Sequence, residues 1–237
     1  SYSKLREVEH LRHDLIHMVA HDMRSPLMGV SGYLELLELE GESLNADQRE
    51  FVARALESAR ALVRQLDAML DADRLESDHL PLHLGDHDVA TLLDRAVSTF
   101  GPIAAERVVW AERPEPGVAV ARCDAEIVIR IVANLLGNAL AYSPEEERID
   151  LAILAREGSV SVEVRDRGPG IPDELRDRIF EKYVTQGGAR GRMRSMGLGL
   201  AFCRLGVEAH GGTIGFRSTG GYGTVFWFEL PVAGPRV

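Results

Sequence analysis

The stretch from Asp166 to Pro172 reads DRGPGIP and lies between a strand pattern and a helix pattern. Its glycines allow another group to approach the backbone closely. The carboxylate of Asp166, at the end of a predicted strand, can accept a hydrogen bond from an exocyclic amine such as that of adenine. The stretch therefore predicts one wall of a nucleotide pocket.

A second glycine pair follows at residues 197–200, which read GLGL and open another predicted helix. The free N–H groups and the positive dipole end of a helix N-terminus suit phosphates. The preceding loop, 184–196, is rich in glycine and carries three arginines: Arg190, Arg192 and Arg194. One glycine pair alone also marks simple turns and caps. Two pairs that flank a basic loop favour a nucleotide site.

Asn134 and Asn138 are four residues apart on one predicted helix, so they share a face. Carboxamide oxygens suit Mg²⁺, a hard ion that binds through oxygen. The alternative is that both side chains cap neighbouring backbone groups, and the spacing alone leaves it open.

The surrounding pattern alternates between strands and helices. Asp88 and Asp124 are predicted helix N-caps, the second for a helix that extends to Tyr142, and Glu157-Gly158 is a predicted hairpin turn. Further helices are predicted at 172–183 and 197–210, and strands at 108–110, 118–121, 149–155, 160–165, 213–217 and 224–230. This order predicts an α/β sandwich, a mixed sheet covered on one face by helices.

The first 80 residues have helical periodicity and almost no strand pattern. Pro26 should kink the first of two long helices, and Asn45 with Gln48 is a predicted N-cap of the second. Two helices cannot bury both apolar stripes against each other, which favours a four-helix bundle made by a homodimer. A monomeric hairpin shielded by the rest of the chain is the alternative. We expect an α+β protein with domains at 1–80 and 86–237.

Histidines recur on one broad face of the first predicted helix, at His10, His13, His17 and His21. A metal site there lacks further ligands besides Asp14, and a plain solvated face is possible. Residues 21–27, HDMRSPL, are more specific. The carboxylate of Asp22 can fix the tautomer of His21 and leave the other ring nitrogen a better nucleophile.

The chain has 237 residues with 27 basic and 37 acidic side chains, a formal charge of −10. This acidity argues against general nucleic-acid binding. The longest stretch without charge, 131–144, is too short for a membrane-spanning helix. Cys123 and Cys203 fit a reducing compartment. We expect a cytoplasmic location and no membrane segment in this chain, although a longer parent could be membrane-bound.

Taken in order, these motifs resemble those of the sensor histidine kinases of two-component signalling. The similar stretches are the H-box HDMRSPL (21–27), the N-box NLLGNALAYS (134–143), the glycine boxes DRGPGIP (166–172) and GLGL (197–200), the F-box IFEKY (179–183), and the terminal Gly223-Thr224. The resemblance implies a dimerisation and phosphoacceptor hairpin followed by a Bergerat-type ATP-binding domain.

The resemblance also implies a reaction, phosphoryl transfer from ATP to His21 with Asp22 as its orienting base. The phosphoryl group would then pass to an aspartate of a response regulator docked on the hairpin. Ser25, one turn after His21, would place a water for phosphatase action. The alternative is that its hydroxyl makes a simple hydrogen bond at a helix terminus or next to the proline.

For the nucleotide, the resemblance implies ATP with Mg²⁺. Asn138 would be the main metal ligand, supported by Asn134, while Tyr142 would lie against the adenine and Asp166 would accept from its amino group. The 184–196 loop would be the lid. The remaining implied nucleotide contacts are Gly168, Gly170, Arg194, Gly197, Gly199, Leu200 and Thr224.

Ala141 departs from the pattern, because many members of the family have a lysine there that meets the phosphates. An arginine of the 184–196 loop is one replacement for that cation. The alternative is a degenerate kinase that acts as a nucleotide-binding regulatory module with weak autokinase activity.

Overall fold

The computed structural model describes residues 2–39, 44–76, 82–100, 102–185, 197–218 and 220–232. Their side chains are described too, except those of 2–17, 21, 57, 60, 64–65, 67–69, 71–76 and 102–103. The chain forms two compact units, Ser1–Ser77 and Asp78–Val237.

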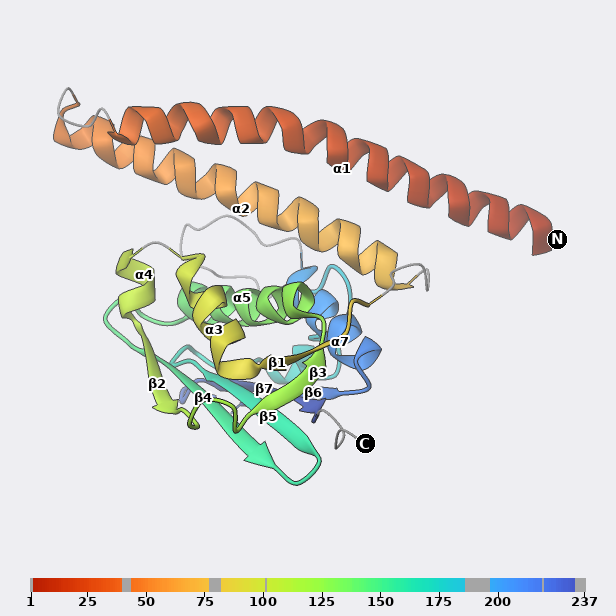
Figure 1. Cartoon of the computed structure of the whole chain (residues 1–237). Helices are drawn as coiled ribbons and strands as arrows, with labels where there is room; N and C mark the ends of the chain where they lie inside the picture. Colours follow the sequence, from red (N-terminus) through yellow and green to blue (C-terminus); the bar gives the residue numbers. More distant parts are fainter. Residues whose placement is uncertain are drawn as a thin grey trace. The chain divides into compact units, whose positions relative to one another are not determined.

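The first unit is a hairpin of two long helices, α1 (Tyr2–Leu39) and α2 (Ala46–Glu76), which lie side by side (Figure 1). Helix α1 continues through Pro26 without a break. The N-terminus of α2 has the predicted cap: the Gln48 N–H donates to Asn45 Oδ1 at 2.9 Å, and the Asn45 N–H donates to Gln48 Oε1 at 3.0 Å. Two N-terminal donors are thereby satisfied reciprocally.

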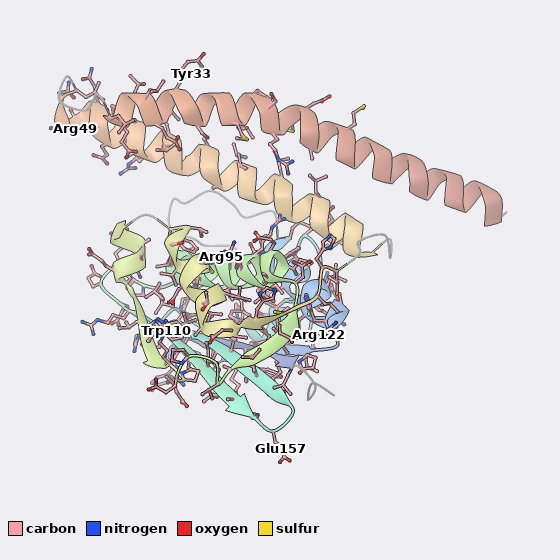
Figure 2. All side chains as sticks on the ribbon, viewed as in Figure 1. Tyr33, Arg49, Arg95, Trp110, Arg122 and Glu157 are labelled. Atoms are coloured by element: carbon pink, nitrogen blue, oxygen red, sulfur yellow. The ribbon has the colours of Figure 1, made fainter. Side chains whose placement is uncertain are left out.

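Much apolar surface of this hairpin is exposed. Among the described side chains, Ala20, Leu66 and Leu70 form a small buried cluster with Leu27 packed against it. Tyr33 is 73% exposed and points away from both helices (Figure 2). Other exposed apolar side chains are Met18, Val19, Met23, Met28, Val30, Leu36, Leu37, Leu39 and Phe51.

The second unit contains a five-stranded mixed sheet in the order β2-β4-β5-β7-β6. Strand β2 pairs parallel with β4, and the other pairs are antiparallel. The strands are β2 (Val108–Glu112), β4 (Ile149–Arg156), β5 (Ser159–Arg165), β6 (Thr213–Ser218) and β7 (Thr224–Pro231). The predicted β4–β5 hairpin is confirmed, with Glu157 at its tip (Figure 2).

Helices α3 (Val89–Ser98), α5 (Ala125–Tyr142) and α7 (Gly199–Ala209) cover one face of this sheet (Figure 1). Between the layers Leu135, Phe202 and Phe228 are fully buried. The predicted caps are confirmed, since Asp88 accepts from the Ala90 N–H and Asp124 accepts from the N–H groups of residues 126 and 127. The mixed sheet under helices confirms the predicted fold class.

Helix α5 is long and apolar enough to cross a membrane by length and composition alone, and it is the one described helix of that kind. Half of it is buried inside the second unit, where it is the central helix of the core. Core packing accounts for its apolar sequence.

The structure corrects the helix predicted at 172–183. Only α6 (Asp173–Arg176) is helical, and the chain then continues in turns such as the Glu181 N–H to Arg178 O bond of 2.8 Å. Tyr183 has a φ of 65°, which no α-helix accommodates, and its N–H donates to Gly197 O at 3.0 Å. At Tyr183 the backbone therefore bonds to a distant segment and does not continue a helix.

Two further elements have no counterpart in the prediction. Strand β1 (Gly85–Asp88) pairs antiparallel with β3 (Val120–Cys123), which begins two residues later than the strand predicted at 118–121. Helix α4 (Pro102–Glu106) is a single short turn before β2. Such short elements have too few residues to show a period.

Candidate functional site

Asp166 lies at the end of β5, beside the start of β7, and is only 6% exposed. Its Oδ1 accepts the backbone N–H of Gly168 at 2.8 Å and that of Thr224 at 3.0 Å. Within the described part of the chain, Oδ2 remains as its free acceptor. Burial raises the pKa of this carboxyl, and the two backbone hydrogen bonds oppose the rise.

The glycines around Asp166 are required by close backbone approach. Gly223 has a φ of 85°, and a Cβ there would collide with the Asp166 carbonyl. A Cβ on Gly168 would lie 3.0 Å from the Tyr142 carbonyl oxygen. Gly170 has a φ of 81°, a left-handed conformation that glycine adopts without strain. The predicted glycine loop is therefore packed directly against the end of α5.

Tyr142 is the last residue of α5 and is half-buried, which raises the pKa of its phenol. The next residue, Ser143, accepts the backbone N–H of Arg167 through its Oγ at 3.1 Å. The structure thus brings Tyr142, Asp166, Gly168 and Thr224 together at one end of α5.

The other end of the site is the N-terminus of α7. Its N-cap residue, Leu198, makes no side-chain cap hydrogen bond, so the first-turn N–H groups have no such partner. A Cβ on Gly199 would lie 3.6 Å from Asn134 Cγ. Leu200, in the first turn, is half-buried.

Asn134 and Asn138 lie on α5 at four-residue steps before Tyr142, and both are half-buried. The Asn134 Nδ2 is buried and has no hydrogen-bond partner in the described part of the chain. A polar stripe on α5 therefore connects the N-terminus of α7 with the glycine loop at Asp166.

Gly197 precedes α7 in a left-handed conformation, with a φ of 68°. A Cβ at this position would lie 2.6 Å from the Val184 carbonyl oxygen, so Gly197 packs closely against the backbone of Val184. Arg190, Arg192 and Arg194 lie outside the described residues, and the role of Arg194 stays a prediction.

In the first unit, His21, Asp22 and Ser25 lie within α1, one turn or less from each other and before Pro26. Asp22 and Ser25 are exposed, whereas the side chain of His21 lies outside the described part of the structure. The imidazole geometry predicted for His21 and Asp22 is therefore not described.

Sequence reasoning missed the part played by Ser218 in this site. Its Oγ accepts the Ile171 N–H at 2.8 Å and lies 3.3 Å from Thr224 Oγ1. These contacts join the glycine loop to both C-terminal strands. A serine at a strand end is common, so the sequence carries no signal for the role.

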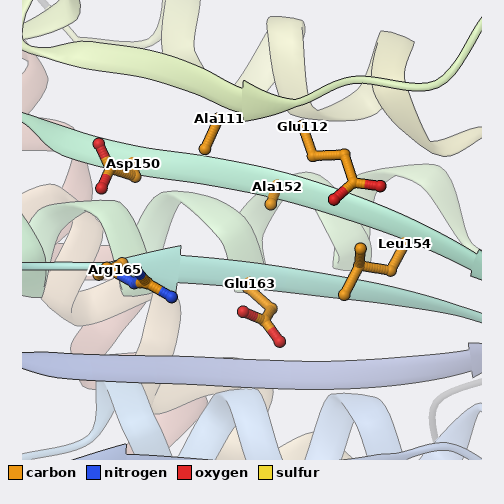
Figure 3. A pocket seen from close by; sticks show the side chains of 7 residues that line it. All are labelled: Ala111, Glu112, Asp150, Ala152, Leu154, Glu163 and Arg165. Carbon is orange, nitrogen blue, oxygen red and sulfur yellow. The ribbon is translucent and has the colours of Figure 1, made fainter.

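A separate hollow of about 170 Å³ lies on the open face of the sheet, away from α5 and α7 (Figure 3). Ala111, Ala152 and Leu154 are among the residues that line it. Two of its carboxylates are paired within the fold, Glu163 with an arginine of β6 at 2.7 Å and Asp150 with Arg167 at 2.9 Å. It contains none of the predicted nucleotide residues.

Two family models match the chain. The His Kinase A (phospho-acceptor) domain matches residues 11–78, and the histidine kinase-, DNA gyrase B- and HSP90-like ATPase matches residues 123–234. The first match contains residues 21–27, and the second contains both glycine boxes.

Curated relatives are similar over nearly the whole chain. Sensor histidine kinase TmoS of Ectopseudomonas mendocina is 30% identical over 98% of this chain and 24% of its own length. Adaptive-response sensory kinase SasA of Crocosphaera subtropica is 31% identical over 96% of this chain and 61% of its own length. The chain thus spans from about a quarter to less than two thirds of these relatives.

Solved structures agree with the sequence relatives. Full-length ShkA in complex with AMPPNP has a TM-score of 0.68 at 32% identity, covering 94% of this chain and 47% of its own. The mycobacterial sensor histidine kinase MprB has a TM-score of 0.54 at 27% identity, covering 62% of this chain and 97% of its own. From both domain matches, these relatives and the fold, the chain belongs to the sensor histidine kinases of two-component systems.

Proposed function

We propose that this chain is a kinase core that transfers the γ-phosphoryl group of ATP to His21 and then to an aspartate of a response regulator. The observation that carries the proposal is the buried Asp166 carboxylate, which has one oxygen fixed by backbone donors and the other left as an acceptor. An acceptor in that place matches the amino group of adenine.

The nucleotide extends from this carboxylate along α5. Tyr142 lies against the adenine, and the uncapped N-terminus of α7 with Gly199 and Leu200 receives the phosphates. Gly168, Gly170, Gly197 and Thr224 keep the backbone close to the ligand. Arg194 contributes positive charge from the lid.

Mg²⁺ fits the donors available on α5. Asn138 is the main ligand, and Asn134, one turn earlier on the same face of α5, supports it. Carboxamide oxygens, phosphate oxygens and water form a hard donor set of the kind that Mg²⁺ prefers. When bound, the metal neutralises the charge that develops on the phosphate oxygens.

At the other centre, a ring nitrogen of His21 attacks the γ-phosphorus. A nitrogen–phosphorus bond forms, the bond between phosphorus and the bridging oxygen breaks, and ADP leaves with that electron pair. Asp22 takes the proton from the other ring nitrogen, which keeps the product neutral at the imidazole. An aspartate of the response regulator then displaces the histidine nitrogen. In the phosphatase function, Ser25 places a water that attacks this aspartyl phosphate, which releases inorganic phosphate and the free carboxylate.

The exposed apolar side chains of α1 and α2 support a homodimer in which two hairpins form a four-helix bundle. The response regulator docks on this bundle, in a cytoplasmic location. The alternative of a nucleotide-binding module without transfer is not favoured, because a phosphoacceptor domain matches the chain as well as an ATPase domain.

Incubation with γ-³²P-labelled ATP and Mg²⁺ tests the proposal. The chain should acquire phosphate that is labile in acid and stable in base, as phosphohistidine is. His21→Ala should abolish the label while ATP binding survives, and His17→Ala, one helical turn earlier, should keep it. Label that persists in His21→Ala would overturn the assignment of the acceptor.

A further inference from the structure

Arg167 connects the loop after α5, residues 143–148, with the glycine loop, residues 166–172. The backbone N–H of Arg167 donates to Ser143 Oγ at 3.1 Å. Its guanidinium donates to the Arg148 carbonyl oxygen and, at 2.9 Å, to Asp150 Oδ2. Arg167 therefore contacts the first residue of this loop with its backbone, and its side chain contacts the last loop residue, Arg148, and Asp150 of β4.

A second arginine also contacts this loop. Arg107, just before β2, donates through Nε to the Glu147 carbonyl oxygen at 3.1 Å and through Nη2 to the Pro144 carbonyl oxygen at 2.6 Å. The Ile149 N–H in turn donates to the Arg107 carbonyl oxygen at 2.8 Å. The loop is thus fixed at both of its flanks.

The Ser143–Arg167 hydrogen bond joins the neighbours of two proposed adenine contacts. Ser143 directly follows Tyr142, and Arg167 directly follows Asp166. Ser143 is 6% exposed, so water does not readily replace its hydroxyl as the acceptor. The close approach of Gly168 to the Tyr142 carbonyl reinforces the same junction.

We propose that Ser143 and Arg167 are positioning residues that set the selectivity for adenine. Their hydrogen bond fixes the Tyr142 ring relative to Asp166 Oδ2, so that a base held against the ring presents its amino group to the carboxylate. The proposal rests on the proposed function, because it assumes that Tyr142 and Asp166 hold the base.

The two contacts of Arg167 predict different effects. Its side chain is 41% exposed and its ion pair with Asp150 lies at the surface, where such pairs contribute little to stability. The backbone N–H of residue 167, by contrast, donates its hydrogen bond to the Ser143 hydroxyl, and a change of side chain at position 167 does not remove this donor. Selectivity should therefore depend more on Ser143 than on the guanidinium.

Equilibrium binding of ATP and of inosine triphosphate, which has an oxygen in place of the 6-amino group, tests this. The wild-type chain should prefer ATP. Ser143→Ala should lower the ratio of the two affinities about tenfold and raise the KM for ATP in autophosphorylation, with little change in kcat. Ser143→Thr, which keeps a hydroxyl, should retain the ratio, and Arg167→Ala should lower it less than Ser143→Ala does.

Arg113→Ala is the matched control, because Arg113 forms a comparable exposed ion pair with Asp94 at 2.6 Å and touches none of these residues. Thermal unfolding of every variant checks the fold. An unchanged ratio in folded Ser143→Ala would overturn the positioning proposal. If the wild-type chain bound neither triphosphate, the proposed function would fail instead. If Ser143→Ala does not fold, Ser143→Thr decides, and a ratio that falls in that folded variant would overturn the proposal.

Discussion

The backbone N–H of Thr224 donates to Oδ1 of Asp166 at 3.0 Å, although the two residues are 58 positions apart in the sequence. The Asp166 N–H returns a hydrogen bond to the Thr224 carbonyl oxygen at 2.8 Å. Because two neighbouring strands make these bonds, the orientation of the carboxylate is fixed by the sheet before any ligand arrives. Such preorganisation lowers the entropy cost of binding.

Asp166→Asn should change which base is bound. An asparagine can keep its oxygen on the Gly168 and Thr224 N–H groups, which directs its NH₂ toward the ligand. Two donors then face each other, so ATP affinity should fall tenfold or more, about 1.4 kcal/mol or greater. Inosine triphosphate, with an acceptor oxygen there, should instead bind to this variant more tightly than to the wild type. Equal losses for both nucleotides would contradict the role given to Asp166.

The affinity for ATP should depend on pH through the protonation of the Asp166 carboxyl. Burial raises its pKa, so affinity should begin to fall at a higher pH on acidification than an exposed aspartate would cause. The free energy of unfolding should depend on pH in the opposite direction. The protonated carboxyl of Asp166 stabilises the fold below the ordinary pKa of aspartate, and this contribution is lost as the pH rises through the raised folded-state pKa. At neutral pH the apo Asp166→Asn variant should therefore unfold at the wild-type temperature or above it. Calorimetry across pH measures both effects.

Gly223→Ala should destabilise the second unit by more than about 1 kcal/mol and weaken ATP binding. The residue has a φ of 85°, and a Cβ would collide with the Asp166 carbonyl, which must shift with its side chain. Gly220→Ala is the matched control in the same turn, since a Cβ there meets nothing within 4 Å and its φ is not positive. Urea unfolding compares the two. Equal urea midpoints for the two variants would mean that the turn accommodates the Cβ of Gly223→Ala with no loss of stability.

Cys123 and Cys203, both fully buried, should not react with a thiol reagent at pH 8 until the second unit unfolds. Burial, with a smaller effect of Asp124, raises the pKa of Cys123 from 9.0 to about 11, and burial also raises that of Cys203. The contribution of the protonated Cys123 thiol to stability is full below 9.0 and is lost as the pH rises through about 11. ATP should slow labelling by stabilising the folded state. Cys123→Ala and Cys203→Ala assign the two signals, and fast labelling of either folded variant would contradict this.

The elements predicted best from the sequence are those whose signals are local. Helix α5 has a capping aspartate, a long apolar pattern and a polar stripe, and the structure has it from Ala125 to Tyr142. The β4–β5 hairpin has its turn at Glu157 and Gly158 as predicted, with Gly158 at a φ of 84°. Some backbone conformations are adopted by only a few residue types, so the sequence predicts them directly.

The elements that were missed depend on contacts between distant segments. The helix predicted to reach Tyr183 ends at Arg176, and the Tyr183 N–H donates to the distant Gly197 carbonyl oxygen instead of continuing a helix. The Ser143–Arg167 bond and the contacts of Ser218 likewise join residues whose types are ordinary in their own segments. Sequence patterns identify the residues that face a ligand more readily than those that hold them in place.

Ala141→Lys should strengthen Mg²⁺–ATP binding. Ala141 is exposed and lies three residues after Asn138 and seven after Asn134, so it shares their face of α5. A lysine there places a cation beside the phosphates, and affinity should rise roughly three- to tenfold at low salt because the attraction is screened only partly.

Ala141→Gln, of similar length without charge, is the control. Titrations at two ionic strengths measure the gain, which should shrink as salt rises. An equal gain in the glutamine variant would show that contact area rather than charge is missing, and no gain in either would mean that a cation of the lid already fills the place of that lysine.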